Sequence, residues 1–179
     1  MDLLADRVKA LSESQTLAMT QKSRELKAQG IDVINLSIGE PDFTVPQHIK
    51  EAAKKAIDDN YSYYPPVAGY EDLRKAIVAK FKRDNNLEFK TEQIVVSNGA
   101  KHSIMNVILS LVNAGDEVII PAPYWVSYIE MIRLARGKAV VIDSSIENDF
   151  KVTPEQIENA ITEKTKIFLY SSPSNPTGS

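Results

Sequence analysis

Apolar residues follow two different patterns along the second half of the chain: short continuous runs, and positions spaced three or four residues apart. The runs are rich in β-branched residues and predict buried strands at residues 94–97, 117–121, 139–143 and 167–171. Helically spaced apolar positions lie between these runs. The alternation of strands with helices predicts a three-layer α/β fold built on a mostly parallel sheet.

Boundary residues agree with this order of elements. Gly115 and Gly137 each stand between a predicted helix and the next strand, where a C-terminal cap is expected. Thr153 opens a Thr-Pro-Glu-Gln capping box, which predicts that a helix begins at the following proline. The first half of the chain predicts helices within residues 2–29, after Pro46 and around Leu73.

The turn after the first predicted strand is a candidate anion site. Ser97-Asn98-Gly99-Ala100 connects residues 94–97 to a helix, so several backbone N–H groups lack partners at the positive end of the helix dipole. Such a turn binds phosphate well, and Ser97 and Lys101 add a hydroxyl and a cation. The alternative is a plain strand-to-helix connection. The turn fits neither the dinucleotide fingerprint nor the Walker lysine loop.

Trp125 is the only tryptophan and follows the strand predicted at 117–121. A lone tryptophan is most often part of a core. Ligands of open α/β sheets, however, bind at the carboxyl ends of the strands, where this indole can cover a flat ring.

Composition excludes several classes of protein. The chain is 43% hydrophobic and 25% charged, with a net charge of −3, which is ordinary for a soluble domain and favours neither nucleic acid nor membrane binding. The absence of cysteine excludes disulfides and fits a cytoplasmic location. His48 and His102 share no ligand spacing with other residues, so no metal site is predicted.

Five stretches together carry a resemblance to a known family: residues 36–43, 64–69, 97–101, 123–128 and 172–178. In this order and spacing the chain resembles the N-terminal part of a fold-type I aminotransferase that depends on pyridoxal 5′-phosphate. The group it resembles is class I, which contains the bacterial aspartate aminotransferases. Each motif alone is weak, but five in register are strong, and the similarity covers the whole chain.

The resemblance implies roles for individual residues. Gly99, Ala100 and Lys101 are expected to cradle the cofactor phosphate, with Lys101 bound either to phosphate or to the distal carboxylate of the substrate. Trp125 is expected to stack on the pyridine ring and contact the substrate. Asn175 is expected to donate its amide to the phenolic oxygen of the cofactor and to contact the substrate α-carboxylate.

Two more residues follow from the same resemblance. Gly39 is expected to bring backbone close to the substrate carboxylate, and Tyr64 to reach the cofactor phosphate of a partner subunit in a homodimer. The alternatives are a tight turn at Gly39 and a rigid surface loop at Tyr64. The resemblance also predicts cis peptide bonds before Pro176 and Pro123.

The catalytic groups are expected elsewhere. In the family, the lysine that forms the Schiff base, the aspartate at the ring nitrogen and the arginine that grips the α-carboxylate all correspond to positions beyond Ser179. No catalytic residue is therefore predicted in this chain, and the isolated chain is expected to be inactive. Residues 1–45 are expected to belong to a small domain, and residues 46–179 to the first part of a large cofactor-binding domain.

The predicted function is transfer of an amino group between an amino acid, aspartate, and a 2-oxo acid such as 2-oxoglutarate. One alternative is a β-lyase or related class I enzyme with the same cofactor. Another is an aminotransferase-like domain of a transcription regulator. That protein needs a DNA-binding segment ahead of the domain, and the motifs begin too close to Met1 for one to be expected.

Overall fold

The structure is a computed structural model that describes residues 3–12, 15–36 and 38–179. It divides into two compact units, each described by itself. Unit 1 combines Met1–Ser37 with Ile104–Ser179, and unit 2 is Ile38–Ser103. The expected small-domain and large-domain boundaries at residues 45 and 46 stay a prediction, because they concern a longer fold.

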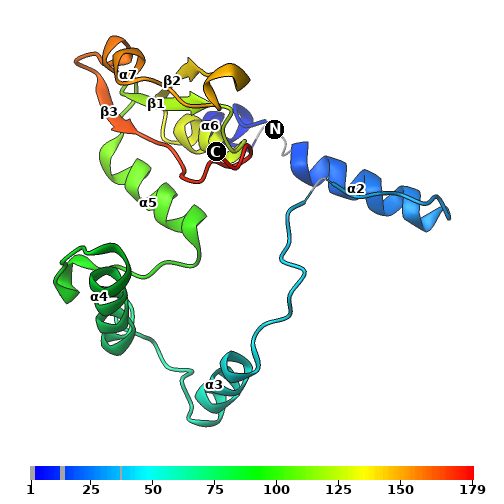
Figure 1. The fold of residues 1–179 in the computed structure, drawn as a ribbon, viewed down its shortest axis with the longest axis vertical. Helices are drawn as coiled ribbons and strands as arrows, with labels where there is room; N and C mark the ends of the chain where they lie inside the picture. The colour runs from blue at the N-terminus through cyan, green and yellow to red at the C-terminus, as the bar shows by residue number, and fades with distance from the viewer. Residues whose placement is uncertain (1–2, 13–14, 37) are drawn as a thin grey trace. The chain divides into compact units, whose positions relative to one another are not determined.

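Unit 1 is built on a parallel sheet of three strands in the order β2-β1-β3 (Figure 1). The strands are β1 (Glu117–Ala122), β2 (Lys138–Asp143) and β3 (Thr165–Phe168). This confirms the parallel α/β sheet and three of the predicted strands. The last strand is shorter than predicted, because beyond Leu169 the chain leaves β1 and enters a loop.

The core of unit 1 lies around β1, whose Val118, Ile119 and Ile120 are all 0% exposed. Val118 and Ile120 pack with buried residues of two helices, α5 (Ala100–Leu111) and α6 (Ser127–Leu134). Ile119 points to the opposite face, because successive strand residues alternate.

Both faces of this sheet are covered. The chain passes from β1 to β2 on one side through α6, and then to β3 on the other side through α7 (Pro154–Ala160). Right-handed crossovers in opposite directions place α6 and α7 on opposite faces, which gives the three layers that the sequence predicts.

The predicted capping box opens α7. The Thr153 hydroxyl accepts the Gln156 backbone N–H at 3.2 Å, and the Gln156 side chain accepts the Thr153 N–H at 2.9 Å. Two of the first unpaired donors of the helix are thereby satisfied, and Pro154 occupies a position that needs no donor.

Gly137 does not have the predicted capping role. The left-handed residue after α6 is Arg136, with φ 62°, and Gly137 follows it. Glycine is required at 137 for space, because a Cβ there would lie 2.6 Å from Val112 Cγ1 and 3.1 Å from Ile132 Cγ2. Gly115 does take a left-handed conformation, with φ 88°, in the turn that follows α5.

The remaining elements of unit 1 are two N-terminal helices, α1 (Asp6–Lys9) and α2 (Gln15–Ala28), and a short 3₁₀ turn, η2 (Ile146–Asn148). No helix among the described residues is long and apolar enough to cross a membrane.

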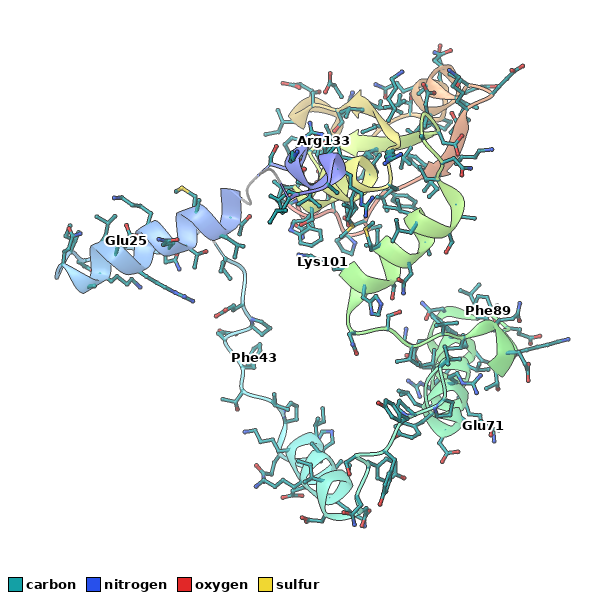
Figure 2. All side chains as sticks on the ribbon, turned by 180° about the vertical axis from the view of Figure 1, so that it is seen from behind. Glu25, Phe43, Glu71, Phe89, Lys101 and Arg133 are labelled. Carbon is teal, nitrogen blue, oxygen red and sulfur yellow. The ribbon has the colours of Figure 1, made fainter. Side chains whose placement is uncertain are left out.

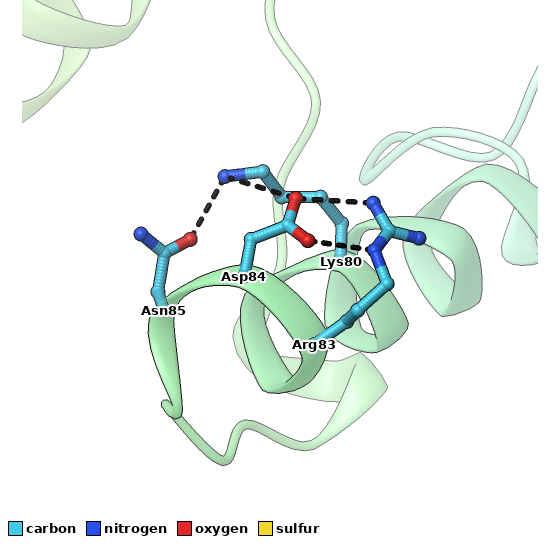
Figure 3. A network of polar contacts seen from close by, with 4 residues as sticks. All are labelled: Lys80, Arg83, Asp84 and Asn85. Carbon is cyan, nitrogen blue, oxygen red and sulfur yellow. Dashed lines mark hydrogen bonds and ion pairs between the residues drawn. The ribbon is translucent and has the colours of Figure 1, made fainter.

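Unit 2 contains α3 (Gln47–Asp58), α4 (Glu71–Asn85) and the 3₁₀ turn η1 (Thr91–Gln93). Near its end α4 carries a network of exposed polar contacts in which Arg83 pairs with Asp84, while Lys80 reaches Asp84 and Asn85 (Figure 3).

The strand predicted at residues 94–97 is wrong. The segment is extended at Ile94, with φ −105° and ψ 127°, but it belongs to no sheet of the described residues. Its Val96 N–H donates to the carbonyl of Ala68, a loop residue, at 3.0 Å. An apolar β-branched run becomes a strand only where a second strand pairs with it, and here a loop takes that place.

Candidate functional site

The carboxyl ends of β1 and β3 border a cavity of about 300 Å³ in unit 1. The two strands are parallel neighbours, so the loops that follow them leave the same edge of the sheet. Tyr124 and Tyr128 contribute to its wall after β1, and Phe168, Tyr170 and Asn175 contribute at and after β3. The wall combines aromatic and aliphatic side chains with one amide, one lysine and several serine residues, which suits a flat polar ring.

Asn175 is held at this cavity by its own loop. The hydroxyl of Ser171 accepts the Asn175 backbone N–H at 2.9 Å. Two backbone contacts close the rest of the loop, from Gly178 N–H to Ser174 O at 2.8 Å and from Ser174 N–H to Ser179 O at 2.7 Å. The amide side chain of Asn175 is therefore placed at the cavity by a loop whose backbone is tied at three points.

Proline geometry in these loops agrees with the prediction. The peptide bonds before Pro123 and Pro176 are both cis. A third cis bond, before Pro173, was not predicted.

Trp125 lies beside the cavity but does not form its wall. The indole is half-buried, packs against the core cluster and meets the Tyr128 ring edge to face, with ring centroids 5.6 Å apart and planes at 85°. Tyr124, the residue before it, lines the cavity instead. The core interpretation of Trp125 is confirmed by its packing, whereas its expected contact with a flat ring stays a prediction.

The Gly99 turn belongs to unit 2, and it leads into a helix as predicted but is not preceded by the predicted strand. Gly99 has φ 85°, its N–H donates to Ser97 O at 2.8 Å, and its carbonyl accepts the His102 N–H at 3.1 Å. The Asn98 N–H donates to His102 Nδ1 at 3.1 Å. Helix α5 begins at Ala100, so the N–H groups of its first residues have no acceptor within the helix.

The donors of this turn fit a phosphate group. Ser97 is half-buried, and Gly99, Ala100 and Lys101 are exposed, with Lys101 in the first turn of α5 (Figure 2). A Cβ built on Gly99 would meet no atom within 4 Å, so the space beside the turn is open. Backbone N–H groups, a hydroxyl and an ammonium at a positive helix end are the groups that hold a dianion.

The other two predicted residues also belong to unit 2. Tyr64 is fully exposed, at 104%, and Gly39 is exposed with open space around it. The described residues of unit 2 show no contact that joins Gly39 or Tyr64 to the Gly99 turn directly. The structure thus brings Trp125 and Asn175 to one edge of one sheet, and it describes Gly39, Tyr64 and the Gly99 turn separately within unit 2.

Sequence reasoning missed the aromatic wall of the cavity. Tyr124, Phe168 and Tyr170 were predicted only as parts of a motif or a strand. Position gave a signal for Tyr124 alone, which follows the strand predicted at 117–121, because Phe168 and Tyr170 fall inside the strand predicted at 167–171 and that strand ends earlier, at Phe168.

The shifted carboxyl groups of unit 1 lie outside this wall. Hydrogen bonds from Thr162 and Lys138 lower the pKa of Glu117, which stands at the amino end of β1. The ammonium of Lys151, which does line the cavity, lowers the pKa of Asp149. Lys151 is thus engaged in an ion pair at the border of the site.

Comparison with known proteins gives a consistent result. The sequence profile described as aminotransferase class I and II matches residues 31–179. Aspartate aminotransferase of Bacillus subtilis is 53% identical over 175 residues, which are 98% of this chain and 44% of that protein. Aspartate/prephenate aminotransferase of Nitrosomonas europaea is 51% identical over 176 residues, which are 98% of this chain and 44% of that protein.

Solved structures agree. Aspartate aminotransferase of Thermus thermophilus with maleate matches with a TM-score of 0.94 and 42% identity, covering 98% of this chain and 46% of that one. Alanine aminotransferase of Pyrococcus furiosus matches with a TM-score of 0.93 and 32% identity, covering 98% of this chain and 45% of that one. The chain therefore spans just under half the length of the relatives that it matches.

Proposed function

Because the chain belongs to the class I and II aminotransferase family, we propose that it is the N-terminal part of an aspartate-type aminotransferase. In this proposal the complete enzyme, a protein of the relatives' length that contains this chain, transfers the amino group of aspartate to a 2-oxo acid such as 2-oxoglutarate. The observation that carries the proposal is the position of Asn175 at an aromatic cavity on the carboxyl edge of a parallel sheet.

Enzymes of this family depend on pyridoxal phosphate. When bound, this cofactor supplies an electron sink for the α-carbon of an amino acid. The backbone N–H groups of the first turn of α5, directly after Gly99, would bind its phosphate with the Ser97 hydroxyl as a further donor, and the open space beside Gly99 supports this role. Lys101 adds a positive charge that serves either the phosphate or the distal carboxylate of aspartate.

Trp125 and Asn175 orient the ring. Trp125 does not line the cavity itself, but from the loop after β1 its indole would cover one face of the ring, and its edge-to-face contact with Tyr128 fixes the indole. The Asn175 amide donates to the phenolic oxygen and keeps it anionic, because a hydrogen bond to the charged form favours that form. Asn175 would also receive the α-carboxylate of the substrate, and the contact expected between Gly39 and a substrate carboxylate stays a prediction.

The complete enzyme is proposed to be a cytoplasmic homodimer. Tyr64 is fully exposed in a loop, directly before Pro65 and Pro66, which suits a side chain that a second subunit uses. The absence of cysteine suits a reducing compartment. Residues 1–45 would join the small domain of that enzyme, and residues 46–179 its large domain.

The test is turnover of aspartate with 2-oxoglutarate by the complete enzyme and by its Asn175→Ala variant. We expect oxaloacetate and glutamate from the parent and at least a tenfold loss of kcat/KM in the variant, about 1.4 kcal/mol. Asn85→Ala is the matched control, because Asn85 lies at the exposed end of α4 (Figure 3). A parent enzyme that releases ammonia from amino acids and transfers none would assign it to the β-lyases instead.

A further inference from the structure

Two segments of unit 2 that carry candidate cofactor residues are joined by backbone contacts. The loop that contains Tyr64 ends at Gly69, and the segment of Val96 leads directly into the Gly99 turn. The Val96 N–H donates to Ala68 O at 3.0 Å. A Cβ on Gly69 would lie 2.8 Å from both Cβ and Cγ2 of Val96, and Gly69 has φ 95°. Glycine is therefore required there, and the two segments touch closely.

The side chain of Arg74 in α4 bonds the same loop and η1, the 3₁₀ turn that precedes the segment of Val96. Its Nε donates to the carbonyl of Gly69 at 3.2 Å, and its Nη1 donates to the carbonyl of Thr91 at 3.2 Å. Arg74 is half-buried, and no ion pair among the described residues joins it to a carboxylate. The guanidinium of Arg74 therefore bonds backbone carbonyls. One belongs to Gly69 in the Tyr64 loop, and the other to Thr91 in η1, which leads toward the Gly99 turn.

The contacts reach the candidate residues through short, stiff stretches of chain. The Gly69 N–H donates to Pro66 O at 2.8 Å, which closes a turn, and Pro65 and Pro66 restrict the backbone that follows Tyr64. In the second segment, the Val96 N–H is bonded to Ala68 O, and the next residue, Ser97, belongs to the Gly99 turn. Arg74 thus holds the loop at Gly69, five positions after Tyr64, and the two prolines limit how the chain between them can move.

We propose that Arg74 is a positioning residue that sets Tyr64 and the Gly99 turn as one unit. Arg74 thereby couples Tyr64, which would contact the cofactor phosphate of the partner subunit, to the Gly99 turn, which would bind the phosphate of the cofactor in its own subunit. This rests on the proposed function for the identity of the ligand. Lysine cannot replace this arginine, because the guanidinium presents separate donors in a rigid fork and an ammonium does not.

The first experiment uses the complete enzyme without cofactor. Arg74→Lys keeps the charge and most of the stem, and Arg83→Lys is the control on the same helix, since Arg83 is exposed and pairs only with the adjacent Asp84 (Figure 3). We expect amide hydrogen exchange at Val96 and Gly69 to become about tenfold faster in Arg74→Lys and to stay unchanged in Arg83→Lys. Unchanged exchange at Val96 and Gly69 in both variants would refute the proposed positioning role of Arg74.

The second experiment separates positioning from general support of the fold. Dissociation constants for pyridoxal phosphate are measured for Tyr64→Phe, Arg74→Lys and the double variant. We expect each single change to weaken binding by about threefold to tenfold, and the double variant to bind about as weakly as the weaker single one. Multiplied effects, or no effect of Tyr64→Phe, overturn the proposal.

Two further outcomes are distinct. A parent enzyme that does not bind pyridoxal phosphate refutes the proposed function, while the exchange experiment still decides whether Arg74 joins the two segments. If Arg74→Lys and Arg74→Gln both fail to fold while Arg83→Lys folds, Arg74 is purely structural and the proposed positioning role is wrong.

Discussion

The hydroxyl of Ser171 accepts the backbone N–H of Asn175 at 2.9 Å. This bond closes the loop after β3 at Asn175, the residue that lines the cavity. The bond bridges a turn that contains Pro173 and leaves the Asn175 side chain available at the wall. Ser171 thereby contributes to the site without being one of the predicted ligand-binding residues.

We expect Ser171→Ala in the complete enzyme to raise the dissociation constant of the cofactor about twofold to tenfold, the equivalent of roughly one hydrogen bond. Ser171→Thr should restore most of the affinity, because it keeps the hydroxyl. Ser110→Ala is the control, since the Ser110 hydroxyl donates to the Asn106 carbonyl within α5, away from the cavity wall. Equal affinities for the Ala variant and the parent would show that the loop holds Asn175 without this bond.

Trp125 tests the ring-binding role. Trp125→Leu should weaken cofactor binding about twofold to tenfold beyond any loss of stability, because aromatic stacking contributes about 0.5–1.5 kcal/mol. Trp125→Phe should retain most of the affinity. Thermal unfolding of both variants, measured without cofactor, corrects for the lost contact with Tyr128. Tight binding by the Leu variant would leave Trp125 with a core role alone.

Acid should weaken the fold through Glu117, which is only 6% exposed. Thr162 and Lys138 lower its pKa in the folded state, so its contribution is present above the ordinary carboxyl pKa of about 4.3 and is lost as the pH falls through the lowered value. Thr162→Val removes the main cause of the shift. The variant should therefore lose less thermal stability than the parent between pH 7 and pH 3.

The control for this prediction is Thr162→Ser, which keeps the hydroxyl that donates to Glu117 at 2.7 Å in the parent. It should follow the pH dependence of the parent. If the parent and Thr162→Val lost equal stability between pH 7 and pH 3, the Thr162 hydrogen bond to Glu117 would not be the source of the pH dependence.

Gly137 should not accept a methyl group. Because an added Cβ would lie 2.6 Å from Val112 Cγ1, we expect Gly137→Ala to destabilise the complete enzyme by about 1–3 kcal/mol. Adding Val112→Ala should recover part of this loss by removing the opposing methyl group. Chemical denaturation of the three variants measures the coupling, and strictly additive effects would contradict the packing explanation.

The isolated 179-residue chain should not transaminate. It supplies groups that hold phosphate and orient a ring, but these contacts alone do not perform covalent chemistry on an amino acid. The single tryptophan gives a specific signal, so weak and reversible quenching of Trp125 fluorescence is expected on addition of pyridoxal phosphate. Turnover by the isolated chain at the rate of the complete enzyme would refute the assignment of catalysis to other residues.

Local signals were sufficient for much of this fold. The runs at 117–121 and 139–143 became strands, and Thr153 caps α7 as predicted, because hydrophobic rhythm and capping depend on neighbouring residues. The two motif residues Trp125 and Asn175 were placed at a strand's carboxyl end by the same reasoning.

Relations between distant residues needed the tertiary structure. Residues 94–97 have the composition of a strand, yet Val96 is bonded to the loop residue Ala68, and composition does not specify the partner of a backbone group. The cavity wall and the two carbonyls bonded by Arg74 also depend on contacts between residues that are distant in the sequence.

The sequence by itself determined the parallel α/β architecture, the ends of several elements and the motifs of an aminotransferase. The tertiary structure decided that Tyr124 and not Trp125 lines the cavity, that Gly137 is a packing residue, and that Arg74 joins two segments. The physical reason is that burial rhythm and caps are properties of a few consecutive residues. Hydrogen-bond partners and contact distances depend on which remote segments folding brings together.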